Sequence, residues 1–195
     1  MIRKILQKED KILRQIAQEV PVKDIKTKKI KKVLKEMREA LSSQNDGVAI
    51  AAPQIGYSLR IFIVSGKVLR AGFPERGVSQ GDGPRGSAVP AGTDSDPAQE
   101  DPAEKNLVFI NPKIPKLSHA KKWVPEGCLS VRPLYGKTFR STKATVEAYD
   151  ENGKKFTRGA SGLLAQIFQH ETDHLNGVLF IDHAKEIKEE VLKEK

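Results

Sequence analysis

The sequence predicts an α+β fold in which antiparallel β-sheets pack around a central helix within a single domain. Length is the first observation: 195 residues with 38% apolar content suffice for one domain with a core, and are too few for two full-sized domains. The second is apolar spacing typical of amphipathic helices. The third is a set of short runs rich in β-branched and aromatic residues, bounded by turn residues, which indicate strands.

The N-terminal third is predicted to be mainly helical. A short helix is expected over Asp10 to Glu19 and a longer one over Asp24 to Gln44. In the longer helix, lysines fill the faces that the apolar stripe leaves open, which indicates a surface helix with one side toward the core. The stripe consists of Ile30, Val33, Leu34, Met37, Ala40 and Leu41.

The strands are predicted from side-chain composition. Their expected positions are Arg60 to Val64, Leu107 to Ile110 and Ala144 to Asp150, and Asn152-Gly153 then forms a hairpin turn into KKFTRG. Between them, Ala71 to Lys105 carries 6 of the 15 glycines and 5 of the 11 prolines and lacks apolar periodicity. We expect a flexible insertion at about residues 71–105 within the single domain 1–195.

Two helices are predicted in the C-terminal part. Ser161 is expected to cap a helix whose apolar residues lead to His170 and His174, and Asn176-Gly177 ends it. The tail from His183 to Lys195 suggests a last amphipathic helix, built on Ile187 and Val191.

Charge and apolar content indicate the setting. The net charge of +9 suggests a polyanionic neighbour such as RNA, since positive potential attracts phosphate, and solubility alone explains the charge about as well. No apolar run approaches the ~20 residues of a membrane helix, and the N-terminus lacks a signal-peptide apolar region. A cytoplasmic protein is therefore expected, with neither DNA nor a membrane as partner.

The segment QHETDH contains HExxH, a metal-binding pattern. Residues i and i+4 share a helix face, so His170 and His174 can converge on one cation, with Glu171 beside them to act on a water. A catalytic metal normally takes three protein ligands. The extended pattern HExxHxxGxxH fails because Phe180 occupies the third position. A glutamate of the charged C-terminus, Glu190 or Glu194, and the thiolate of Cys128 in EGCLS are the remaining alternatives.

Three segments in order resemble the signature motifs of the peptide deformylase family: GVAIAAPQIG (47–56), EGCLS (126–130) and QHETDH (169–174). The resemblance implies an enzyme that removes the N-formyl group from formylmethionine of nascent polypeptides and releases formate. It implies Cys128, His170 and His174 as ligands of one divalent metal, with Fe2+ expected and Zn2+, Ni2+ or Co2+ also suited to these ligands. Glu171 would transfer the proton, and Gln54 with the backbone N–H of Leu129 would hold the oxyanion.

The same motifs suggest the residues that bind substrate. Gly127 permits the close approach of a second backbone, and four apolar residues are candidates for a methionine pocket: Val48, Ile50, Leu163 and Ile167. Two positions depart from the family pattern. Ala49 stands where the family usually has glycine, and Arg132 stands where proline is frequent.

Two other functions are consistent with parts of the sequence. A zinc endopeptidase would use Glu190 or Glu194 as third ligand, and a non-catalytic RNA-binding protein would use the lysine-rich helix. Transient ribosome contact through a basic surface is compatible with deformylation, because nascent chains emerge at the ribosome.

Overall fold

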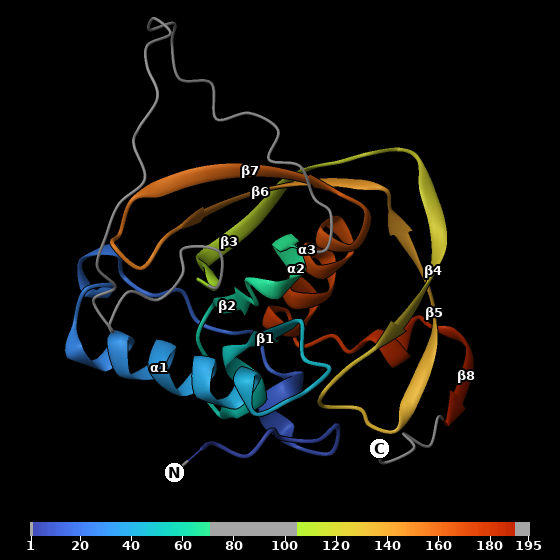
Figure 1. The fold of residues 1–195 in the computed structure, drawn as a ribbon, viewed down its shortest axis with the longest axis horizontal. Helices are drawn as coiled ribbons and strands as arrows, with labels where there is room; N and C mark the ends of the chain where they lie inside the picture. The colour runs from blue at the N-terminus through green and yellow to red at the C-terminus, as the bar shows by residue number, and fades with distance from the viewer. Residues whose placement is uncertain (1, 71–104, 190–195) are drawn as a thin grey trace, which may run out of the picture.

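A computed structural model describes residues 2–70 and 105–189, which form two antiparallel sheets around helix α3 (Figure 1). One sheet has the strand order β1-β2-β3-β6-β7 and the other β4-β5-β8. The strands are β1 (Ala49–Ala51), β2 (Ile61–Val64), β3 (Leu107–Leu117), β4 (Lys121–Gly127), β5 (Leu134–Ser141), β6 (Lys143–Tyr149), β7 (Lys155–Ser161) and β8 (Lys185–Glu189). The α-helices are α1 (Lys28–Ser42), α2 (Lys67–Arg70) and α3 (Gly162–Leu175), and short 3-10 turns are η1 (Lys11–Arg14), η2 (Val22–Asp24), η3 (Ala52–Ile55) and η5 (Phe180–Asp182). The predicted α+β fold class is confirmed.

Helix α1 covers one side of the five-stranded sheet with the predicted apolar stripe. All six residues of that stripe are buried. The helix begins four residues later than predicted, because Val22–Asp24 forms the turn η2 and Thr27 is the N-cap, whose hydroxyl accepts a bond from the N–H of Ile30. The period of the apolar residues thus predicted the buried face but not the first turn.

Helix α3 carries the HExxH residues and packs against strands of the five-stranded sheet, including β1, β6 and β7. Ser161 occupies the N-cap position, but its side chain makes no capping bond, so this detail of the prediction is wrong. The predicted end is confirmed: Gly177 has φ of 74°, and a Cβ there would lie 2.7 Å from the carbonyl oxygen of Arg14. Only glycine fits this turn without strain.

An aromatic cluster joins α3 to the sheet. Phe62 and Phe109 are stacked with ring centroids 4.5 Å apart, and Phe168 of α3 meets the Phe109 ring edge-on at 5.1 Å. All three side chains are fully buried. The cluster fixes the position of α3, and with it the positions of His170 and His174.

Truncating this cluster gives a stability prediction. Phe168→Ala is expected to lower the free energy of unfolding by about 3–5 kcal/mol, because it removes buried apolar surface and leaves a cavity. Urea denaturation followed by circular dichroism measures this loss. Exposed Phe139→Ala is the matched control, expected to change stability by less than about 1 kcal/mol, and equal losses in the two variants would contradict the packing argument.

Two helix predictions are wrong. The predicted helix Asp10 to Glu19 contains only the turn Lys11–Arg14, because backbone groups after it bond elsewhere: Ala17 N–H donates to Leu175 and Gln18 N–H to Ser58. In the tail, Lys185–Glu189 forms strand β8, which pairs with β5.

Residues 190–195 lie outside the described residues, as does the predicted insertion at about 71–105 except for its last residue, Lys105. Within the described residues, no helix has the length and apolar content needed to cross a membrane.

Candidate metal centre and substrate cavity

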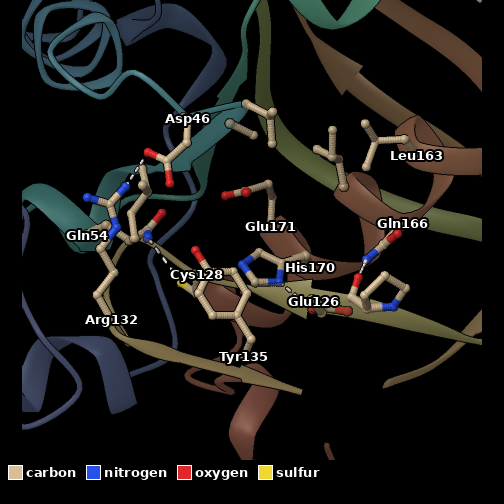
Figure 2. A pocket seen from close by; sticks show the side chains of 17 residues that line it. Asp46, Gln54, Glu126, Cys128, Arg132, Tyr135, Leu163, Gln166, His170 and Glu171 are labelled. Atoms are coloured by element: carbon tan, nitrogen blue, oxygen red, sulfur yellow. Dashed lines mark hydrogen bonds and ion pairs between the residues drawn. The ribbon is translucent and has the colours of Figure 1, made fainter. Parts of the chain in front are cut away.

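A cavity of about 300 Å³ opens beside α3, between the segment around β1 and the end of β4 (Figure 2). All three signature motifs contribute to its wall, although they are far apart in the sequence. The lining residues are Asp46, Gly47, Val48, Ala49, Gln54, Pro125, Glu126, Gly127, Cys128, Leu129, Arg132, Tyr135, Leu163, Gln166, Ile167, His170 and Glu171.

Three side chains present metal-binding atoms to one another: Cys128 and His170 line this cavity, and His174 is buried next to them. One ligand atom each from Cys128, His170 and His174 lies within 4.8 Å of the others. The Sγ of Cys128 is 3.2 Å from Nε2 of His174, and the two imidazole centroids are 4.8 Å apart, one helical turn along α3. One thiolate and two imidazoles form a donor set that suits a divalent transition metal and leaves a coordination position open for water or substrate. The residues present therefore fit such an ion.

A buried carboxylate orients His170. Glu126 Oε1 contacts Nδ1 of His170 at 2.5 Å, which leaves the other ring nitrogen free to turn toward Cys128. Arg140 holds this carboxylate through Nη2 at 2.8 Å and reaches Asp173 through Nη1 at 2.6 Å. Burial opposes ionisation of Glu126, but the hydrogen bonds from His170 and Arg140 outweigh it and hold the pKa of this carboxyl well below its ordinary value.

Sequence reasoning did not identify Glu126 and Arg140 as site residues. Asp173 binds Arg140 and so extends this chain of polar contacts. The sequence held one indication of the role of Glu126: it lies two residues before the candidate ligand Cys128. A histidine ligand often donates its second ring N–H to a carboxylate, and Glu126 could supply that carboxylate. Arg140 had no local indication, because only the pairing of β4 with β5 brings it beneath Glu126.

Glu171 lines the cavity together with Cys128 and His170 (Figure 2). Its side chain is almost fully buried, and Oε2 has no hydrogen-bond partner within the described residues. Burial is the main reason that the pKa of Glu171 rises from 4.5 to about 7, and the nearby imidazole of His170 opposes the rise only in part. A carboxylate of this kind can exchange a proton near neutral pH, and a cation bound next to it would favour the ionised form.

Gln54 and Leu129 both lie next to Cys128. The amide nitrogen of Gln54 donates to Ser130 Oγ at 3.0 Å and lies 3.6 Å from Cys128 Sγ, while Oε1 accepts from the N–H of Ala51. These bonds fix the amide so that an N–H faces the sulfur. The backbone N–H of Leu129 makes no hydrogen bond to any other described residue.

Four of the five predicted substrate-binding residues line the cavity: Val48, Gly127, Leu163 and Ile167. Ile50 does not, and this expectation is corrected. Ile50 is fully buried in the cluster beneath α1, whereas Ala49 lines the cavity. Side chains alternate along a strand, so β1 turns Ala49 toward α3 and Ile50 toward α1.

The wall includes contacts that the sequence did not predict. A Cβ on Gly127 would lie 2.4 Å from the ring of Tyr135, so the close approach that requires glycine there involves this side chain and not a second backbone. Arg132 connects two loops at the cavity edge: it bonds Asp46 and donates to Gln44 Oε1 at 3.0 Å. Gln166 donates to the carbonyl of Pro125 at 2.8 Å, joining α3 to β4.

The comparison with known families decides the identification. The model of the polypeptide deformylase family matches residues 2–78 and 84–190. The chain belongs to the peptide deformylase family. Peptide deformylase 2 of Clostridium acetobutylicum is 34% identical over 181 residues, which cover 93% of this chain and 94% of that protein. A peptide deformylase of Halothermothrix orenii is 37% identical, with 94% of each chain covered.

Solved structures of peptide deformylases agree with this fold. One from Legionella pneumophila has a TM-score of 0.70 at 32% identity, covering 95% of this chain and 88% of that one. A Met-Ala-Ser-bound one from Acinetobacter baumannii has a TM-score of 0.71 at 26% identity, covering 94% and 98%. The protein is thus an enzyme of a metal-dependent hydrolase family that removes the formyl group from N-terminal formylmethionine of nascent peptides. This function replaces the endopeptidase and non-catalytic alternatives.

Proposed function

We propose that Cys128, His170 and His174 bind the divalent metal ion at which peptide deformylation takes place. The observation that carries this proposal is the convergence of one sulfur and two imidazole nitrogens within 4.8 Å, with Cys128 and His170 lining the cavity. When bound, a divalent ion at such a site lowers the pKa of a coordinated water and polarises a carbonyl oxygen. We expect Fe2+ from the resemblance to bacterial deformylases, and the same ligands suit Zn2+, Ni2+ or Co2+.

Glu171 is proposed as the group that moves the proton. Its carboxylate takes a proton from the attacking water as the water oxygen bonds to the formyl carbon. The same carboxyl then gives this proton to the amide nitrogen as the C–N bond breaks, so that formate and a free amino terminus leave. Its burial beside the donor atoms and its pKa of about 7 support this role.

Gln54 and Leu129 are proposed to stabilise the oxygen that becomes negative during the attack. The amide of Gln54 is held in place by Ser130 and by the backbone of Ala51, so its donor does not need to reorganise. The N–H of Leu129 follows Cys128 directly and has no partner among the described residues. In comparable sites, one such donor lowers the activation free energy of the reaction by about 3–4 kcal/mol.

The cavity beside these groups is proposed to take the methionine side chain. Val48, Leu163 and Ile167 give it an apolar wall, and about 300 Å³ is at the lower end of the volumes typical of small-molecule sites. Ala49 adds a methyl group to this wall where the family usually has glycine. We propose that this methyl group narrows the path of the substrate backbone.

Formate release tests the proposed function directly. The metal-loaded protein, prepared without oxygen, is incubated with formyl-Met-Ala-Ser, because a structurally similar deformylase was solved with Met-Ala-Ser bound. We expect formate from this peptide and no deacylation of acetyl-Met-Ala-Ser, whose extra methyl group crowds the carbonyl carbon. Absence of formate with one equivalent of metal bound would contradict the proposal.

A second prediction concerns the carboxylate behind His170. Glu126→Gln is expected to weaken metal binding about 10- to 100-fold, because the imidazole loses the anionic partner that fixes its orientation. Competition with a chelator measures the affinity, and thermal unfolding checks that the variant is folded. Glu147→Gln, at an exposed ion pair with Lys155, is the matched control. Unchanged metal affinity in the folded Glu126 variant would exclude the orienting role.

The cellular setting is proposed from the substrate. Formylated nascent chains emerge from ribosomes, so we propose that residues 1–195 form one catalytic domain that works in the cytoplasm and contacts the ribosome transiently through a basic surface. The net charge of +9 supports this contact.

A further inference from the structure

We propose that the outer face of the sheet β4-β5-β8 binds single-stranded RNA. This aromatic-basic face consists of Trp123 and Phe139 with the surrounding lysines Lys121, Lys137 and Lys185. The inference rests on the proposed contact with the ribosome for its biological setting, but RNA binding is measured without any deformylase substrate.

Two large aromatic side chains lie side by side on this face. Trp123 of β4 pairs in register with Phe139 of β5, and their ring centroids are 5.2 Å apart. The two residues remain 45% and 50% exposed, although each has a strand neighbour that is buried on the opposite face. Exposed aromatic rings that gather on one surface mark an interaction site more often than chance.

Cations accompany both rings. The Nζ of Lys185 lies 5.1 Å from the centroid of the Trp123 ring, and Nζ of Lys121 lies 6.0 Å from that of Phe139. Within the described residues, neither of these lysines forms an ion pair with a carboxylate, whereas Lys137 binds Glu186 at 2.7 Å. Two charges on this face are therefore available to neutralise phosphates.

Rings flanked by uncompensated cations match the chemistry of single-stranded nucleic acid. Bases of any sequence stack on aromatic side chains, while lysines beside them contact the phosphates. The lysine-rich helix α1 offers positive charge but no aromatic rings on which bases could stack. Lys32 and Lys35 pair with Glu36 and Glu39, and no residue of α1 is aromatic. The aromatic-basic face is thus favoured over α1 as the RNA contact.

The aromatic-basic face continues into the wall of the active-site cavity. Side chains two apart along a strand share a face, so Trp123, Pro125 and Gly127 lie on the same side of β4. Pro125 and Gly127 line the cavity. In Figure 1, β4 and β5 extend away from α3 on one side of the molecule. RNA bound to these strands would lie next to the cavity that receives the peptide.

Trp123 is the only tryptophan in the chain, so its fluorescence reports the proposed stacking directly. Titration with a twelve-residue oligouridylate is expected to quench this emission. Trp123→Ala is expected to weaken binding of the fluorescein-labelled oligonucleotide about 5- to 150-fold, as measured by fluorescence anisotropy. The full-length protein is used in every measurement.

Salt dependence separates this face from general positive charge. The double variant Lys121→Gln and Lys185→Gln is expected to reduce the slope of log affinity against log salt by about 1.4, since each phosphate contact on a single strand contributes ~0.7. The matched control, Lys29→Gln with Lys31→Gln on α1, removes the same charge and is expected to leave quenching and affinity within about twofold of the parent.

Three outcomes would overturn the proposal. They are absence of quenching by the oligonucleotide, an equal loss of affinity in the α1 control, and a response of Trp123 to phosphatidylglycerol vesicles but not to RNA. Formate release from formyl-Met-Ala-Ser is expected to be unchanged in all of these variants, because none of the substituted residues lines the cavity. Failure of RNA binding with intact formate release would therefore leave the deformylase function standing.

Discussion

Replacement of Glu171 by glutamine is expected to lower kcat/KM on formyl-Met-Ala-Ser by about 10²- to 10⁴-fold, the usual contribution of a positioned general base. Glutamine keeps the shape of the side chain but cannot accept and return a proton. Because Glu171 supplies none of the three converging donor atoms, the variant is expected to retain one equivalent of metal. Formate release and metal analysis on the same preparation measure both quantities.

Stability provides the control for this variant. Glu171 Oε2 is buried with no partner among the described residues, so the substitution removes no side-chain hydrogen bond from that atom. We therefore expect the folded structure to persist, with a thermal unfolding temperature no lower than that of the parent. Glu39→Gln on α1 makes the same chemical change at an exposed ion pair and is expected to keep full activity. A Glu171→Gln enzyme with parental kcat/KM would exclude the proposed proton transfer.

The second large effect is expected at the metal ligands. Cys128→Ser is expected to lose the metal during dialysis and to reduce formate release to background, because a serine hydroxyl stays protonated at neutral pH and is a poor ligand for a transition metal. The loss in affinity is expected to exceed the ~10- to 100-fold typical of changes behind a ligand. Metal analysis after dialysis gives the stoichiometry.

Two histidine substitutions, one at the site and one away from it, control for nonspecific effects on metal content. His174→Gln removes a proposed ligand, while His119→Gln changes an exposed histidine away from the cavity. We expect the first to behave like Cys128→Ser and the second to retain one equivalent of metal and full activity. Metal retention in both Cys128→Ser and His174→Gln would require a different ligand set.

The two ends of the chain explain which structural elements the sequence could predict. The stripe of α1 is a local pattern with a period of one helical turn, so its burial follows from spacing alone. Strand β8 contains similar residues, but it exists because β5 offers an unpaired edge, and Lys137 lies opposite Lys185. Such pairing between segments distant in the sequence has no local signal, and the tail was therefore wrongly predicted as a helix.

The same distinction holds at the site. Six predicted residues lie together because motif order and helix geometry constrain them: Gln54, Cys128, Leu129, His170, Glu171 and His174. The roles of these residues remain proposals. Ile50 was assigned to the cavity in error, because the sequence does not reveal which face of a short buried strand points to α3. The chain of contacts from His170 through Glu126 to Arg140 depends on strand pairing and could not be predicted from local pattern.

Anomalous diffraction from crystals of the Co2+-loaded protein locates the bound metal ion relative to Cys128, His170 and His174. We expect one anomalous peak in the cavity, about 2.3 Å from the sulfur of Cys128 and about 2.0–2.1 Å from one nitrogen each of His170 and His174, as for related thiolate and imidazole sites. A fully loaded protein whose metal peak lies beyond bonding distance of Cys128, with the surrounding fold unchanged, would contradict it.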